Sequence, residues 1–156
     1  MEWQNINREL VLEFFYFFSR FEYALKRAGF LTTKKWAEPN WTGFFQKVTA
    51  AEILADPSDV ELKKSLHFLE KRKPRYQANE NGKMVWLHIC KKEDWTRERY
   101  VLELIKTVRN NLFHGGKFPE GPISEPAGDE ELLRHCLVIL KRCLACDDKV
   151  KQMFDS

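Results

Sequence analysis

The sequence lacks an apolar segment long enough to cross a bilayer. Its most apolar run, Leu10–Phe18, is interrupted by Glu13 and soon followed by Arg20, and no small-residue cleavage site of a secretory signal comes after it. A regular cysteine framework is also missing, because the four cysteines show none of the spacing of a disulfide-rich secreted domain. We therefore expect a cytoplasmic protein that is not inserted in a membrane.

Strong net charge is absent too. The formal charge is only +3, so any attraction to nucleic acid must come from local clusters of basic residues. The chain has 156 residues, of which 44% are hydrophobic and 31% charged, and it contains no internal repeat, low-complexity tract or linker. These properties predict one globular domain over residues 1–156.

Apolar residues recur at helical spacing along most of the chain. Helices are predicted at about 7–28, at 42–55, from a Ser58 cap to 71, from an Asp94 cap to the 109–114 segment, and as one long helix after about residue 128. Between them, Asn81-Gly82 separates 75–78 from the apolar 84–89, which is a strong hairpin signal. The predicted fold is an all-α bundle of about five helices with a small β-hairpin inserted near residues 75–90.

Glu22 interrupts the apolar face of the first predicted helix. Helical spacing places its carboxylate among Val11, Phe15, Phe18 and Leu25. An unpaired carboxylate in a dry interior costs several kcal/mol, so we expect a cationic or hydrogen-bonding partner. The alternative is an edge position that reaches solvent.

Packing does not explain the segment 109–117, which reads RNNLFHGGK. An arginine holds phosphate at any physiological pH, and a histidine moves protons near neutrality, so Arg109 and His114 together suit cleavage of a phosphodiester without a metal. Five helical positions separate the two side chains by roughly 140°, but the two following glycines suggest that the last turn frays or tightens. Asn110 precedes His114 by four positions and can bind its ring or a phosphate oxygen.

Gly115 and Gly116 can turn backbone N–H groups toward an anion, with Lys117 adding a charge beside them. The alternative is structural: Arg109 is then a surface residue, the helix end favours the imidazolium form of His114, and the glycines only cap the helix.

The RNNLFH segment resembles the signature of the HEPN superfamily, in which an arginine, a polar residue and a short spacer precede a histidine. The run FFSRFEYALKRAG at 17–29 is similar to the first helix of one stand-alone branch, and the Asn-Gly hairpin fits that branch as well. Members are small helical bundles, many of them metal-independent endoribonucleases that act as toxins or antiviral effectors. A tyrosine that some toxins carry two residues after the histidine is replaced here by Gly116, which argues against control by its modification.

The resemblance implies a homodimer whose two motif helices face each other and form one composite cleft without a cofactor. His114 would act on the ribose 2′-hydroxyl or on the leaving 5′-oxygen, and Arg109 would steady the scissile phosphate. Asn110 matches the polar position of the motif. Glu22 would orient Arg109 or His114 from the first helix, an assignment that depends more on its spacing than on the motif.

A basic cluster ends the third predicted helix and forms a second candidate RNA contact, with Tyr76 beside it to stack on a base. An ordinary solvated helix end, whose cations complement the helix dipole, explains the same residues. The cluster comprises Lys71, Arg72, Lys73 and Arg75.

Metal binding is not expected. Cys143 and Cys146 form a Cys-x-x-Cys, but a second pair of ligands at suitable spacing is missing, and Cys136 and Cys143 fall on the apolar stripe of the last helix. Single histidines at 67 and 88 have no evident partners, and the tryptophans at 36, 41, 86 and 95 fill cores or dimer contacts more often than they stack nucleotides.

The leading interpretation is therefore a homodimeric endoribonuclease of a toxin–antitoxin or phage-defence system. A non-catalytic HEPN-like module that binds RNA, a nucleotide or a protein stays open, as does an adaptor or immunity subunit with an antitoxin or defence-complex partner. The sequence leaves the identity of the RNA undetermined, because selectivity resides in shape and loop contacts.

Overall fold

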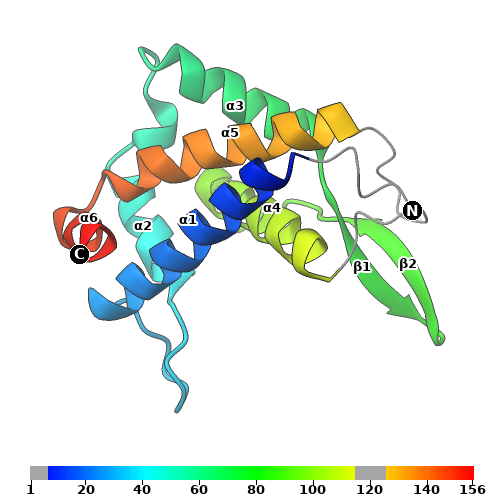
Figure 1. Cartoon of the computed structure of the whole chain (residues 1–156), viewed down its shortest axis with the longest axis horizontal. Helices are drawn as coiled ribbons and strands as arrows, with labels where there is room; N and C mark the ends of the chain where they lie inside the picture. Colours follow the sequence, from blue (N-terminus) through cyan, green and yellow to red (C-terminus); the bar gives the residue numbers. More distant parts are fainter. Residues whose placement is uncertain (1–6, 115–125) are drawn as a thin grey trace.

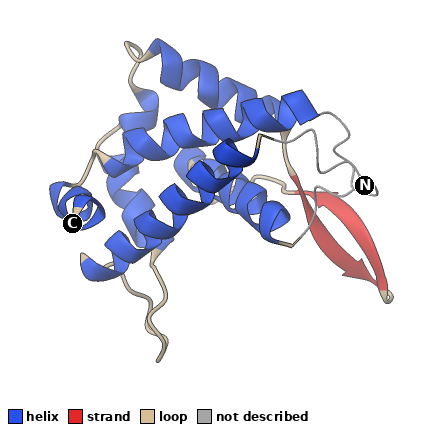
Figure 2. Cartoon of the chain, viewed as in Figure 1, coloured by secondary structure: helices blue, strands red, loops and turns tan. Residues whose placement is uncertain are grey.

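The structure of the protein, a computed structural model, describes residues 7–114 and 126–156. Within them the chain forms six α-helices, one 3₁₀ turn and a two-stranded antiparallel hairpin (Figures 1 and 2). The elements are α1 (Arg8–Arg27), α2 (Trp41–Ala50), η2 (Ile53–Ala55), α3 (Val60–Arg72), β1 (Arg75–Glu80), β2 (Lys83–His88), α4 (Arg97–Phe113), α5 (Pro126–Leu144) and α6 (Asp148–Asp155). The expected helical bundle with an inserted hairpin is confirmed.

The first helix begins and ends close to the predicted positions. The side chain of Asn7 accepts a hydrogen bond from the Leu10 N–H and so satisfies one of the free donors at the start of α1. The predicted apolar stripe faces the core, where Phe21 packs edge-on against Phe44 of α2 and Phe154 of α6. Its buried members are Leu10, Phe14, Phe17, Phe18, Phe21 and Leu25.

Three predicted helix starts or ends were wrong. The cap of α3 is Asp59, whose carboxylate accepts from the Leu62 N–H, while Ser58 instead donates to Asp56. The cap of α4 is Thr96 rather than Asp94. The second predicted helix stops at Ala50 because Glu52 adopts a positive φ of 53°, and the chain then forms the short η2.

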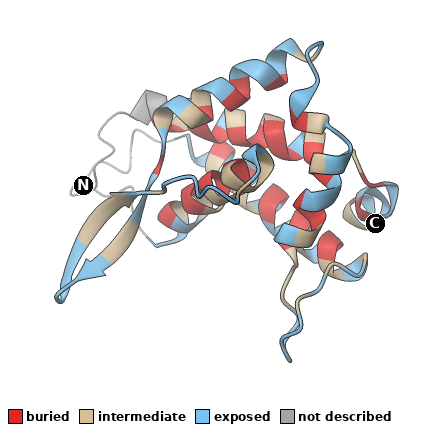
Figure 3. Cartoon of the chain, turned by 180° about the vertical axis from the view of Figure 1, so that it is seen from behind, coloured by how far each residue is buried: buried red, intermediate tan, exposed pale blue. Residues whose placement is uncertain are grey.

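The hairpin forms where the Asn-Gly pair predicted it. Asn81 and Gly82 have φ of 54° and 79°, the left-handed geometry that a two-residue hairpin turn requires. Arg75 pairs with His88 at one end of the ladder and Glu80 with Lys83 at the other. No residue of either strand is buried, and the hairpin projects from the helical body (Figure 3).

The long last helix of the prediction is two helices. The chain breaks at Asp147, whose carboxylate accepts from the Val150 N–H and thereby caps α6. Lys47 of α2 donates to the same carboxylate at 2.8 Å. Burial acts against the charge of Asp147, but the hydrogen bond from Lys47 and those from the backbone of α6 outweigh it and lower the pKa of this group.

The helices share one core. α5 packs against α3 and α1, α6 packs across α1, and α2 lies against α4. Figure 3 shows the buried residues on the helix faces turned inward, whereas the segment between α1 and α2 is largely exposed. Among the described residues, no helix is long and apolar enough to cross a membrane.

Candidate functional site

Helix α4 carries the RNNLFH segment at its C-terminal end. Its inward stripe of Val101, Leu104, Ile105 and Val108 is buried, so the remaining face of the helix points away from the core. The end of this face presents Arg109, Asn110, Phe113 and His114, of which only Arg109 is half-buried and the others are exposed.

Arg109 is held in a defined position. Its guanidinium carbon lies 5.7 Å from the ring centre of Phe18 on α1 and 5.7 Å from that of Phe113 on α4. Its Nη1 donates to Oδ1 of Asn110 at 2.8 Å. The two rings leave other N–H groups of the guanidinium available to an anion.

His114 is the C-terminal cap of α4. Its backbone N–H donates to the Asn110 carbonyl at 2.8 Å, with φ −95° and ψ 18°. This i−4 hydrogen bond keeps the chain α-helical up to His114, whereas the two glycines expected to make the last turn fray or tighten lie outside the described residues. The imidazole lies edge-on to Phe113, with ring centres 5.2 Å apart.

Phe113 connects the two polar side chains. The guanidinium of Arg109 and the imidazole of His114 both contact its ring, although helical geometry turns them apart by roughly 140°. The Phe113 side chain is 68% exposed. Phe113 was not predicted as a site residue, because the sequence argument considered only the polar side chains on either side of it.

Asn111 has a structural role that was also missed. It is buried, and its Nδ2 donates to the Arg75 carbonyl at 2.7 Å, which ties the start of β1 to α4. The signal was present, since Asn111 follows Leu104 by seven positions and Val108 by three and so falls on the inward stripe.

Glu22 has the hydrogen-bonding partner that its position required. Its Oε1 accepts from the indole Nε1 of Trp41 at 3.0 Å, and Trp41 packs on Phe18 with ring centres 5.2 Å apart. Within the described residues, no ion pair joins Glu22 to Arg109 or His114. Arg109 donates a hydrogen bond to Asn110, whereas Glu22 accepts one from Trp41.

The predicted basic cluster does not form one free cationic patch. Arg72 lies 3.9 Å from Asp129 of α5, and Nε of Arg75 donates to Nε2 of His88 across the hairpin. Lys73 ends α3 with a positive φ of 47°, and Lys71 is exposed. Lys117 lies outside the described residues.

The predictions for the cysteines and tryptophans can be compared with burial. Cys136 and Cys143 are buried as expected for packing residues, and burial raises the pKa of the Cys143 thiol. In the described part of the chain, no group of three His, Cys, Asp or Glu side chains is arranged to hold a metal ion. Trp41 is a core residue with 5% exposure, whereas Trp36 is 69% exposed.

Comparison of the chain with protein-family models, with curated proteins and with solved structures gives no match. The functional argument therefore depends on the residues and their geometry.

Proposed function

We propose that this chain is a metal-independent endoribonuclease of the HEPN type that cuts RNA in a toxin–antitoxin or phage-defence setting. The observation that carries the proposal is the shared contact of Arg109 and His114 with the exposed ring of Phe113. A phosphate-binding cation and a proton-transfer group at one end of one helix are the two functions that cleavage of a phosphodiester requires.

The chemistry follows from these two groups. The ribose 2′-oxygen attacks the adjacent phosphorus, and the bond from phosphorus to the 5′-oxygen breaks. One imidazole takes the 2′-hydroxyl proton and a second donates a proton to the leaving 5′-oxygen. The guanidinium of Arg109 stabilises the charge that builds on the non-bridging oxygens. The products are a 2′,3′-cyclic phosphate and a 5′-hydroxyl, and DNA is not a substrate.

Two imidazoles at one phosphate imply two copies of the chain, since each copy supplies one His114. Apolar side chains are exposed on both helices: Leu12 and Tyr16 lie one turn apart on α1, and each is 68% exposed, like Phe113 of α4. Arg109 bridges from Phe113 to Phe18 of α1. A second copy that covered these side chains would remove a large apolar area from water, which favours association.

Two substitutions test the proposal on RNA in excess chelator. His114→Ala removes proton transfer and is expected to lower cleavage by at least about 100-fold. Arg109→Ala removes charge stabilisation and is expected to lower it by about 100- to 1,000-fold. Both residues lie near the C-terminal end of α4, outside its buried stripe, so the circular dichroism spectra of both variants should match that of the parent.

Matched controls exist elsewhere on the chain. His67 on α3 and Arg134 on α5 are exposed, and His67→Ala and Arg134→Ala should cut RNA like the parent. Equal cleavage by His114→Ala and the parent would remove His114 from the mechanism. Retention of intact RNA by the parent would instead favour a non-catalytic RNA-binding module.

A further inference from the structure

The loop between α1 and α2, residues 29–40, is a fixed projection, which we name the Trp36 loop. Leu31 and Pro39 form an antiparallel bridge, the Thr32 N–H donates to the Glu38 carbonyl at 3.0 Å, and the Asn40 N–H donates to the Phe30 carbonyl at 2.9 Å. These bonds close the loop like a short hairpin. It extends away from the helical body in Figures 1 and 2.

The tip of the Trp36 loop presents an indole together with cations. Trp36 is 69% exposed, and the Lys34 ammonium lies 5.8 Å from its ring centre. Lys34 also forms an ion pair with Glu38 at 2.6 Å, which fixes the lysine beside the ring, and Lys35 is exposed. An exposed large aromatic side chain that is held in place, rather than folded onto the body, is a ready surface for stacking.

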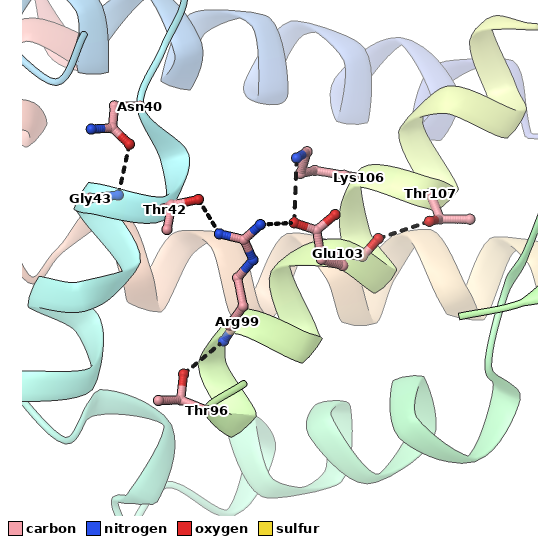
Figure 4. A network of polar contacts seen from close by, with 8 residues as sticks. All are labelled: Asn40, Thr42, Gly43, Thr96, Arg99, Glu103, Lys106 and Thr107. Carbon is pink, nitrogen blue, oxygen red and sulfur yellow. Dashed lines mark hydrogen bonds and ion pairs between the residues drawn. The ribbon is translucent and has the colours of Figure 1, made fainter. Parts of the chain in front are cut away.

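The end of the Trp36 loop is anchored beside the candidate site. The first residue of α2, Trp41, donates a hydrogen bond to Glu22 and packs on Phe18. The ring of Phe18 also contacts the guanidinium of Arg109. The next residue, Thr42, accepts a hydrogen bond from Nη1 of Arg99 on α4 (Figure 4). The loop end is therefore joined to both α1 and α4.

Two further contacts make this anchor rigid. Oδ1 of Asn40 accepts from the Gly43 N–H at 2.9 Å and caps α2, and a Cβ on Gly43 would lie only 2.8 Å from the Asn40 amide. Arg99 is held in turn by Glu103 at 3.1 Å, as Figure 4 shows. The glycine and the Arg99–Glu103 pair thus fix the direction in which the loop leaves the body.

Lys106 of α4 shares a helix with the candidate site, and its ammonium lies 3.5 Å from the carboxylate of Glu103. It precedes Arg109 by three positions and Phe113 by seven, so it shares their face of the helix. The hydrogen bond from Lys34 lowers the pKa of Glu38 most, and the charge of Lys106 adds to the same effect. Lys106 is therefore close enough to the loop for its charge to act on Glu38.

We propose that Trp36 stacks on a base of single-stranded RNA, while Lys34, Lys35 and Lys106 contact the phosphates between that base and the scissile linkage at Arg109 and His114. An indole flanked by ammonium groups suits both the face of a base and the backbone charge of a flexible strand. The inference rests on the proposed function for its choice of RNA and names single-stranded RNA as the substrate class.

Charge favours RNA over an apolar partner. Apart from Trp36, the loop tip is formed by polar or small residues, and Lys26 and Arg27 at the end of α1 add two cations near its base. A protein pocket that took up the indole would have to accommodate these ammonium groups as well. An RNA strand neutralises them and releases counterions.

The test measures binding of the full chain to a labelled 2′-O-methyl oligonucleotide, which cannot be cut by 2′-hydroxyl attack, by fluorescence anisotropy. Trp36→Ala is expected to weaken binding about 10-fold or more, and Trp36→Phe should retain most of the affinity because a phenyl ring also stacks. Tyr23→Ala is the matched control, since Tyr23 is an exposed ring on α1 outside the Trp36 loop and should leave affinity unchanged.

The outcomes separate this inference from the proposed function. His114→Ala should bind the oligonucleotide like the parent. A loss of oligonucleotide affinity in Trp36→Ala alone supports the role of the Trp36 loop in RNA binding, even if the parent cuts no RNA. If the parent cuts RNA and Trp36→Ala binds as tightly as the parent, the loop assignment is overturned and the nuclease is not. A second experiment measures binding of the chain to vesicles of anionic lipid. If Trp36→Ala loses affinity for the vesicles but not for the oligonucleotide, the assignment of the Trp36 loop to RNA is also overturned.

Discussion

Asn110 connects the two side chains on which the proposed chemistry depends. Its side-chain oxygen accepts from Arg109 and its backbone carbonyl accepts from His114. Within the described residues, the exposed amide makes no other hydrogen bond, so we assign it the role of holding the guanidinium in place. Since Asn110 acts through Arg109, we regard it as a positioning residue.

We predict that Asn110→Ala lowers the kcat of RNA cleavage about 10-fold, the usual worth of one hydrogen bond to a charged group. Asn110→Asp restores an acceptor for Arg109, so its kcat should recover, while its KM rises because a carboxylate repels the phosphates of RNA. Steady-state kinetics on a defined oligonucleotide separate the two effects. A kcat in Asn110→Ala equal to that of the parent would show that Arg109 needs no such support.

For the single residue Glu22, the sequence predicted the need for a hydrogen-bonding partner but not the identity of that partner. A carboxylate on the apolar side of an amphipathic helix follows from spacing alone. The partner Trp41 lies 19 positions away across a loop and is fixed by the packing of α2 against α1. The same limit hid the exposure of Trp36, because nothing local distinguishes it from the buried Trp41.

A buried polar contact joins helices α3 and α5 within their apolar interface. Ser65 is fully buried, and its hydroxyl lies 2.9 Å from Nδ1 of His135, whose ring packs on Phe68 with centres 4.5 Å apart. Burial is the largest influence on His135 and lowers its pKa below the ordinary 6.5, although the charge of Glu131 acts in the opposite direction. The folded protein therefore holds this imidazole in its neutral form.

This contact predicts a pH dependence of stability. The unfolded chain binds a proton at His135 more readily than the folded chain does. The contribution of His135 to the free energy of unfolding is therefore complete above about pH 6.5, and it is lost as the pH falls through the lowered pKa of the folded state. His135→Gln keeps an acceptor for Ser65 and should lose part of this dependence. Urea unfolding at about pH 8 and about pH 5.5 measures it. The exposed His67→Gln should keep the dependence of the parent, and an unchanged slope in His135→Gln would contradict the account.

Elements defined by local chemistry were predictable, and those defined by distant contacts were not. The hairpin needs only Asn81-Gly82 between two strands, and α1 needs only its apolar period. The break between α5 and α6 occurs where Asp147 meets Lys47, 100 positions earlier in the chain. Helical spacing continues across that break, so the sequence alone predicted one long helix.

At the scale of the whole molecule, the account requires two chains at one cleft. Leu12 and Tyr16 are exposed on α1, away from the proposed catalytic groups, so charged substitutions there should separate the copies without altering His114. We expect Leu12→Lys and Tyr16→Lys to shift the proposed dimer to monomer in analytical ultracentrifugation and to lower cleavage in parallel. Val60 on α3 is 76% exposed, and Val60→Lys is the matched control that should stay dimeric and active. A parent that is monomeric at concentrations where it cuts RNA would rule out a composite site.

The most direct test of the central claim is the chemistry of the product ends after incubation of the purified chain with RNA in excess chelator. The account predicts 2′,3′-cyclic phosphate and 5′-hydroxyl ends by mass spectrometry, and no cleavage where the scissile ribose carries a 2′-deoxy group or where the protein is His114→Ala. Intact RNA with the parent, or cleavage at the 2′-deoxy position, would contradict it.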